Sequence, residues 1–125
     1  MIDGSPSGSN NESELPTVNR CAVTLVATEA YRDWARSCFE DEGETTLEEV
    51  RREPTVYLLP ESDGDLARLV QRHYKSMLAQ ELVSWCTDET AWPKDLSLRT
   101  FRSFFEVHVT TMVFDLGAEP LEIDV

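Results

Sequence analysis

The stretch from Leu66 to Trp85 constrains the fold of this chain more than any other. It contains no proline or glycine, and its larger side chains recur at the i, i+3, i+4, i+7 spacing of one helix face. A stripe of this width is enough to cover a sheet, so the stretch predicts a long amphipathic helix packed on strands. The stripe consists of Leu66, Leu69, Val70, His73, Tyr74, Met77, Leu78, Glu81, Leu82 and Trp85.

Hydrogen-bonding residues mark the expected helix starts. Ser62 and Asp65 form a Ser-x-x-acid cap before the long helix. Thr28 is expected to cap a helix that reaches about Phe39. Two further caps predict short helices. Thr46 with Glu49 is a capping box for residues 47–52, and Ser97 precedes a helix over residues 98–104.

Three segments are typical of strands. Residues 20–28 and 55–59 are rich in β-branched and apolar residues, and Pro60 closes the second. The third, residues 105–116, alternates, so one face is expected to carry Glu106, His108, Thr110, Met112 and Phe114.

These elements predict a small two-layer α/β sandwich, with an α+β arrangement also possible. About three strands would carry helices on one face, in the order β-α-α-β-α-α-β. Helical connections favour right-handed crossovers, and the strand order stays open. At 125 residues the chain has the length of one domain. We expect residues 1–17 to be a disordered acidic tail rich in Ser, Gly and Asn, residues 18–120 to form the domain, and residues 121–125 to fray.

The net charge of −13 bears on partners. An acidic chain repels phosphate, so neither nucleic acid nor an anionic membrane is expected to bind. The acidic run from Glu40 to Glu49 could instead occupy a basic site on a partner. The excess of acid is explained by solubility, or alternatively by adaptation to high salt.

Cysteine usage and the N-terminus favour a cytoplasmic protein. Cys21, Cys38 and Cys86 are odd in number and form no Cys-x-x-Cys pair, so we expect reduced thiols and no metal site. The first residues have neither a basic nor an apolar region, which argues against a secretory signal. No Gly-x-Ser-x-Gly elbow or glycine-rich phosphate loop is present, and no cofactor is expected.

The pattern PTVYLLPE, the amphipathic helix, the WCTDE and WP segments and the MVFDL segment together resemble a family of small, acidic, uncharacterised bacterial proteins. The resemblance covers residues 20–120. It implies a single cytoplasmic α/β domain, and it carries no catalytic residue or cofactor over to this chain.

The loop that joins the two C-terminal tryptophans has two interpretations. Trp85 and Trp92, with Asp88 and Glu89 between them, could recognise a cationic peptide or small amine. Alternatively, the indoles cover the end of the core and Asp88 caps a turn.

The sequence therefore favours a non-enzymatic module that binds a protein partner or itself. Its surface would be the open sheet face and the Trp85–Trp92 loop. The alternative is a small enzyme with an acid/base site, in which Glu106 orients His108 near Asp88 and Glu89. The candidate interface residues are Trp85, Asp88, Glu89, Trp92, Glu106, His108, Thr110, Met112 and Phe114.

Overall fold

The computed structural model describes residues 15–38 and 45–124. Their secondary structure follows the predicted order, with one additional 3₁₀ turn after the long helix. The elements are β1 (Arg20–Ala27), α1 (Glu29–Ser37), α2 (Leu47–Arg51), β2 (Thr55–Pro60), α3 (Leu66–Trp85), the turn η2 (Glu89–Ala91), α4 (Leu98–Phe104) and β3 (Phe105–Thr110).

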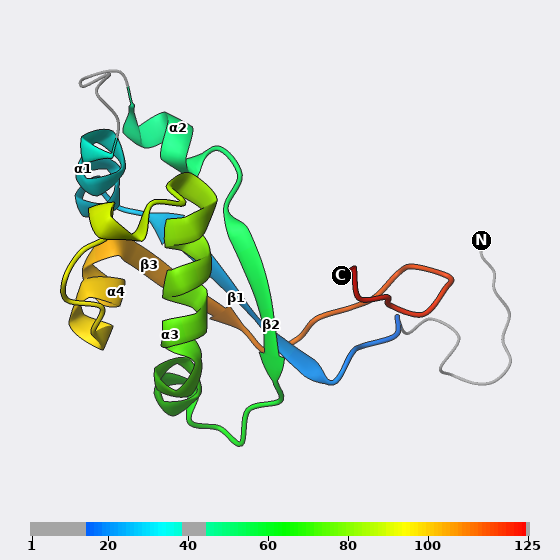
Figure 1. The fold of residues 1–125 in the computed structure, drawn as a ribbon. Coiled ribbons are helices and arrows are strands. Elements are labelled where there is room, and N and C mark those ends of the chain that lie inside the picture. The colour runs from blue at the N-terminus through cyan, green and yellow to red at the C-terminus, as the bar shows by residue number, and fades with distance from the viewer. Residues whose placement is uncertain (1–14, 39–44, 125) are drawn as a thin grey trace, which may run out of the picture.

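The three strands form one open sheet in the order β2-β1-β3 (Figure 1). Both neighbours of β1 run antiparallel to it, with Val23 opposite Tyr57 on one side and Val109 on the other. The outer strands are therefore parallel to each other, and α3 and α4 form the crossover between them. This arrangement confirms the predicted three-stranded sandwich and selects its α+β form.

The core lies between one face of the sheet and the helices. Cys21, Val23, Leu25 and Ala27 of β1 are buried, as alternation along a strand requires. The central positions of the predicted helical stripe pack against them. From α3, these buried residues are Leu69, Val70, Met77, Leu78 and Leu82.

Two predicted caps differ from those in the structure. The long helix is capped by Asp65, whose Oδ1 accepts from Arg68 N at 3.1 Å, while Ser62 Oγ accepts from Gly64 N at 2.9 Å in the preceding turn. Gly64 has φ of 111°, a conformation that L side chains rarely adopt, which turns the chain into the helix at Asp65 rather than at Ser62.

Thr28 occupies the N-cap position of α1 but makes no side-chain cap bond there. Its hydroxyl instead donates to the carbonyl oxygens of Ser103 and Phe104, at 2.6 and 3.0 Å. The caps predicted at Thr46 and Ser97 are confirmed, since each hydroxyl accepts the expected backbone N–H.

The predicted third strand is too long: β3 ends at Thr110, not at Leu116. A change of register explains this. In the ladder Ala22 lies opposite Thr110, but beyond the ladder Thr17 lies opposite Phe114, so the β1 side holds one extra residue. The extra residue breaks the regular pairing, as a bulge does.

Residues 15–19 and 112–124 form what we call the arm, which projects from one end of the sheet away from the helices (Figure 1). Its two segments are joined by hydrogen bonds from Val18 N to Val113 O and from Asp115 N to Pro16 O, both of 2.9 Å. Residues 15–17, predicted to be tail, are thus paired. The predictions for residues 1–14, 39–44 and 125 lie outside the described residues.

Candidate functional site

The sheet face away from the helices has no cover among the described residues. Val56 and Leu58 of the edge strand β2 lie on it and expose 56% and 47% of their surface. The register places Thr24 between Val56 and His108, and Ala22 between Leu58 and Thr110. The face is therefore apolar along β2 and polar along β3. Its residues are Ala22, Thr24, Val26, Val56, Leu58, Glu106, His108 and Thr110, which we call the open face.

The polar half of the open face contains a contact between neighbouring side chains of one strand. His108 Nε2 lies 3.5 Å from Glu106 Oε1, although residues at i and i+2 are about 7 Å apart along a strand. The two side chains lean together, and both are more than half exposed. In such an exposed position the pair contributes little to stability.

The arm extends the apolar surface beyond the sheet. Met112 and Phe114, predicted to continue the row of Glu106 and His108, lie on the arm instead of on the strand. Both are exposed, by 66% and 46% respectively. The arm exposes four further large apolar side chains: Leu15, Leu116, Leu121 and Ile123.

The loop between α3 and α4 is held by hydrogen bonds from the indole nitrogens. Trp85 Nε1 donates to Ala35 O at 3.1 Å, and Trp92 Nε1 donates to Cys86 O at 2.9 Å. Trp34 on α1 completes the arrangement by donating to Ala91 O at 2.9 Å. All three indoles also pack against the core. These contacts are the ones that the structural interpretation of the loop requires.

The two acids of this loop are at its exposed rim. Asp88 caps η2, because its Oδ1 accepts from Thr90 Oγ1 at 2.6 Å and from Thr90 N at 3.0 Å. These hydrogen bonds, first the one from the side chain, lower the pKa of Asp88. Glu89 follows it in the first position of the turn.

The structure does not bring the four residues of the catalytic alternative together. Glu106 and His108 lie on the open face. Asp88 and Glu89 follow α3, which packs on the opposite face of the sheet. Proton transfer needs hydrogen-bond reach, about 3 Å, and the sheet stands between the two pairs.

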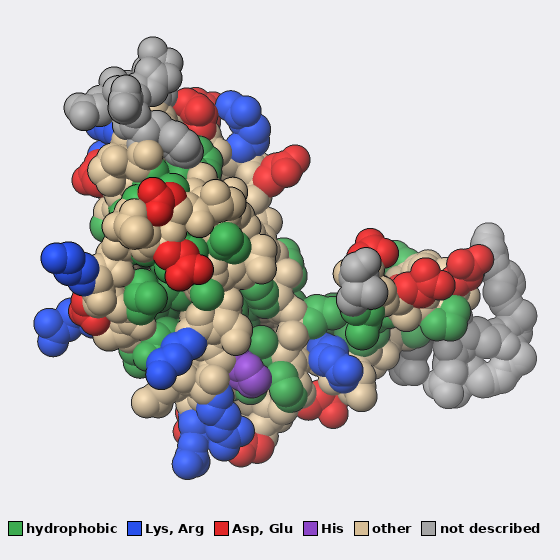
Figure 2. Space-filling view, in the orientation of Figure 1, with side chains coloured by type: hydrophobic (Ala, Val, Ile, Leu, Met, Phe, Trp, Pro, Cys, Tyr) green, Lys and Arg blue, Asp and Glu red, His purple; other side chains and the backbone are tan. Residues whose placement is uncertain are grey.

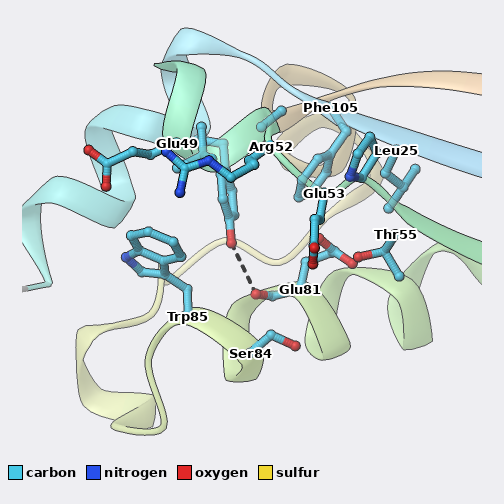
Figure 3. A pocket seen from close by; sticks show the side chains of 13 residues that line it. Leu25, Glu49, Arg52, Glu53, Thr55, Glu81, Ser84, Trp85 and Phe105 are labelled. Atoms are coloured by element: carbon cyan, nitrogen blue, oxygen red, sulfur yellow. Dashed lines mark hydrogen bonds between the residues drawn. The ribbon is translucent and has the colours of Figure 1, made fainter. Parts of the chain in front are cut away.

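A cleft of 380 Å³ opens between α2, the C-terminal half of α3 and the ends of β1 and β2 (Figure 3). Two residues that line it, Tyr31 and Glu81, are joined by a hydrogen bond of 3.0 Å from the Tyr31 hydroxyl to Glu81 O. The Tyr57 hydroxyl, from β2, donates to Glu81 Oε2 at 2.5 Å. Burial, followed by the nearby Glu81 carboxylate, raises the pKa of both tyrosines. Both hydroxyls therefore stay protonated, and the half-buried Glu81 is already bonded within the chain.

The three cysteines are free thiols, as predicted. Burial and then a hydrogen bond with Cys86 raise the pKa of Cys38 from 9.0 to about 12, so it is a weak nucleophile. Among the described residues, no group of three His, Cys, Asp or Glu side chains is arranged to hold a metal ion. Within the same part of the chain, no helix has the length and apolar character needed to cross a membrane.

Sequence reasoning missed the apolar half of the open face. The sequence shows that Val56 and Leu58 share one face of the strand, opposite Thr55, Tyr57 and Leu59. It does not show which of the two faces the helices cover, since both carry large side chains that could be buried. Only the packing of α3 against the Leu59 side left Val56 and Leu58 exposed.

Comparison with protein-family models, with curated proteins and with solved structures gives no match to this chain.

Proposed function

We propose that this protein is a non-enzymatic interaction module that associates with a second copy of itself through the open face. The exposure of Val56 and Leu58 on a sheet face without covering helices carries the proposal. Burying such side chains releases about 25 cal/mol per Å² of apolar surface, which favours a contact between two such faces. Self-association also suits the charge, because the open face holds only Glu106 and His108 as ionisable groups in a chain of net charge −13.

The open face alone is small for a stable interface, so the proposed contact includes part of the arm. Three strands about 4.8 Å apart and six residues long span roughly 300 Å², against about 800 Å² per partner in a stable interface. Met112 and Phe114 are the first exposed apolar residues of the arm along the chain after Thr110, which is in the last pair of the β1–β3 ladder. Their apolar area extends the contact toward the size that a lasting dimer needs.

The Trp85–Trp92 loop lies on the helix side of the sheet, so one partner lying flat on the open face does not also contact it. The indole hydrogen bonds hold this loop against the rest of the helical layer, which supports a structural role for it. We therefore assign the proposed self-association to the open face and the arm. We further propose a cytoplasmic location, supported by the three free cysteines.

Substitutions of exposed apolar residues by threonine test the proposal. Val56→Thr with Leu58→Thr keeps strand propensity but removes apolar surface from the open face, so dimer affinity should fall by at least about tenfold. The matched control is Val83→Thr with Leu96→Thr. It makes the same two chemical changes on the helix side, at side chains that expose 37% and 39% of their surface. Sedimentation equilibrium over a wide concentration range measures both.

A wild-type chain that stays monomeric at millimolar concentration would contradict the proposal. So would a dimer that the two double variants weaken equally. Circular dichroism confirms that each variant remains folded.

A further inference from the structure

The basic residues of this acidic chain concentrate on two neighbouring helices. Residues 66–80 and 98–104 hold five of the eleven lysines and arginines and none of the 24 acids. We call these five residues the basic face. They are Arg68, Arg72 and Lys75 on α3, and Arg99 and Arg102 on α4.

The five side chains share the outer surface of the helical layer. Arg68, Arg72 and Lys75 follow the i, i+4, i+7 spacing on the side of α3 opposite its buried stripe, and all are exposed. Arg99 and Arg102 are likewise exposed on α4, one turn apart. Figure 2 shows Lys and Arg side chains over α4 and over the N-terminal half of α3 on one side of the molecule. The two helices are in contact, with the Tyr74 and Phe101 rings 5.9 Å apart.

None of the five charged groups has an ion-pair or hydrogen-bond partner among residues 15–38 and 45–124. Four of the other six basic residues, Arg20 among them, make side-chain hydrogen bonds within the described part of the chain, whereas the exposed Arg52 and Lys94 have no partner there. Arg32 pairs with Asp33, Arg36 donates to Thr45 O, and Arg51 donates to Ala27 O. Among the described residues, the basic face is thus where several exposed cationic groups without an internal partner gather on two helices that are in contact.

We infer that the basic face binds a short acidic polypeptide segment of a partner protein, with carboxylates at alternate positions. Arg68 and Arg72 are separated by about 6 Å along the helix, at 1.5 Å per residue. Alternate side chains of an extended segment are about 6.6 Å apart, so two carboxylates can face two arginines at once. Arginine also binds carboxylates through two parallel hydrogen bonds, which favours this ligand chemistry.

The borders of the basic face favour a short segment over a nucleic acid. Asp63 and Asp65 lie at the start of α3, and Asp95 precedes α4, where it accepts from Ser97 Oγ at 3.1 Å. A long polyphosphate would cross these acids and meet the repulsion of the whole chain. Bases also need exposed rings for stacking, whereas Tyr74 is half-buried and Phe101 is buried.

The test uses a fluorescent peptide of alternating Glu and Ser, with a Gln-Ser peptide of equal length as the neutral probe. Fluorescence anisotropy at low salt should show binding of the acidic peptide alone, weakening as salt is added. Arg72→Gln with Arg102→Gln should weaken it about tenfold, since two exposed ion pairs with the peptide are lost together. Arg20→Gln with Arg52→Gln makes the same change in net charge outside the basic face and should leave the affinity unchanged.

Three results would overturn the inference. They are no binding of the acidic peptide at low salt, equal losses in the two double variants, and equal binding of the Gln-Ser peptide. A single-stranded DNA oligonucleotide and phosphatidylserine vesicles form the remaining arms. Tighter binding of either one than of the acidic peptide, lost in the Arg72 and Arg102 variant, would assign the basic face to phosphate instead. These readouts are independent of the dimer, because the basic face lies on the other side of the sheet from the open face.

Discussion

Glu81 shows how single residues join the layers of this molecule. It lies on the buried stripe of α3, yet it is bonded by tyrosines from two other elements, Tyr31 of α1 and Tyr57 of β2. Periodicity predicts that Glu81 faces the sheet. It does not identify the partners, which are 50 and 24 residues away in the sequence. Tyr31 donates to the backbone carbonyl of Glu81, and Tyr57 donates to its carboxylate. A half-buried carboxylate needs a donor such as the Tyr57 hydroxyl, because desolvation without a hydrogen bond is costly.

Replacing Tyr57 by Phe should destabilise the protein by about 1.5–3 kcal/mol, the usual range for a hydrogen bond to a charged group. Tyr31→Phe removes a hydrogen bond to a neutral carbonyl and should cost about 1 kcal/mol. Urea denaturation of both variants gives the two free energies of unfolding. Equal costs, or a larger cost for Tyr31→Phe, would contradict the assigned roles.

At the scale of elements, the helices are joined to one another by their ends. The last carbonyls of α4 have no partner within their own helix, and the hydroxyl and backbone N–H of Thr28 at the start of α1 supply donors. The indole nitrogens of Trp34 and Trp85 similarly reach backbone carbonyls of other segments. The sequence predicted a cap at Thr28, but a cap motif considers only the residues that follow it.

Three substitutions distinguish the predicted N-cap role of Thr28 from its role as a hydroxyl donor to the carbonyls at the end of α4. Thr28→Val removes the hydroxyl and should cost about 1–2 kcal/mol, while Thr28→Ser keeps it and should remain close to wild type. Thr28→Asn is the deciding variant, because Asn is a good N-cap but lacks the hydroxyl at this position. Thermal unfolding should place Asn near Val. Stability equal to that of Ser would show an ordinary cap instead.

At the scale of the whole molecule, the sheet separates the open face from the basic face. The open face is nearly uncharged, the basic face occupies the outer surface of α3 and α4, and the acids are distributed around them. One buried and two half-buried neutral groups add a pH dependence. Tyr31, Tyr57 and Cys38 all have a pKa above the ordinary value, chiefly through burial.

Stability should therefore fall at alkaline pH. A group whose folded pKa is raised binds its proton more tightly when folded, so its contribution is complete below the unfolded pKa and is lost as pH rises. For Cys38 this window runs from 9.0 to about 12, and for the tyrosines it begins above 10.0. Guanidinium unfolding from neutral pH upward measures the loss. Tyr31→Phe with Tyr57→Phe should make the decline shallower, and an unchanged decline would exclude the tyrosines as its cause.

The sequence by itself determined the elements and their order, because periodicity and cap chemistry are local properties of a few neighbouring residues. It therefore predicted the long helix α3, although not the residue that caps it, the starts of β1, β2 and β3, and the three-stranded sandwich. It also identified Glu106, His108 and Thr110 as one row of side chains.

Tertiary structure decided what local pattern could not. It set the strand order, the end of β3 at a register shift, and the distant partners of Thr28 and Glu81. It also decided which of two apolar faces of β2 the helices cover, and so left Val56 and Leu58 as surface. Each outcome depends on contacts between segments far apart in the chain, where the free energy of packing the whole core selects one arrangement.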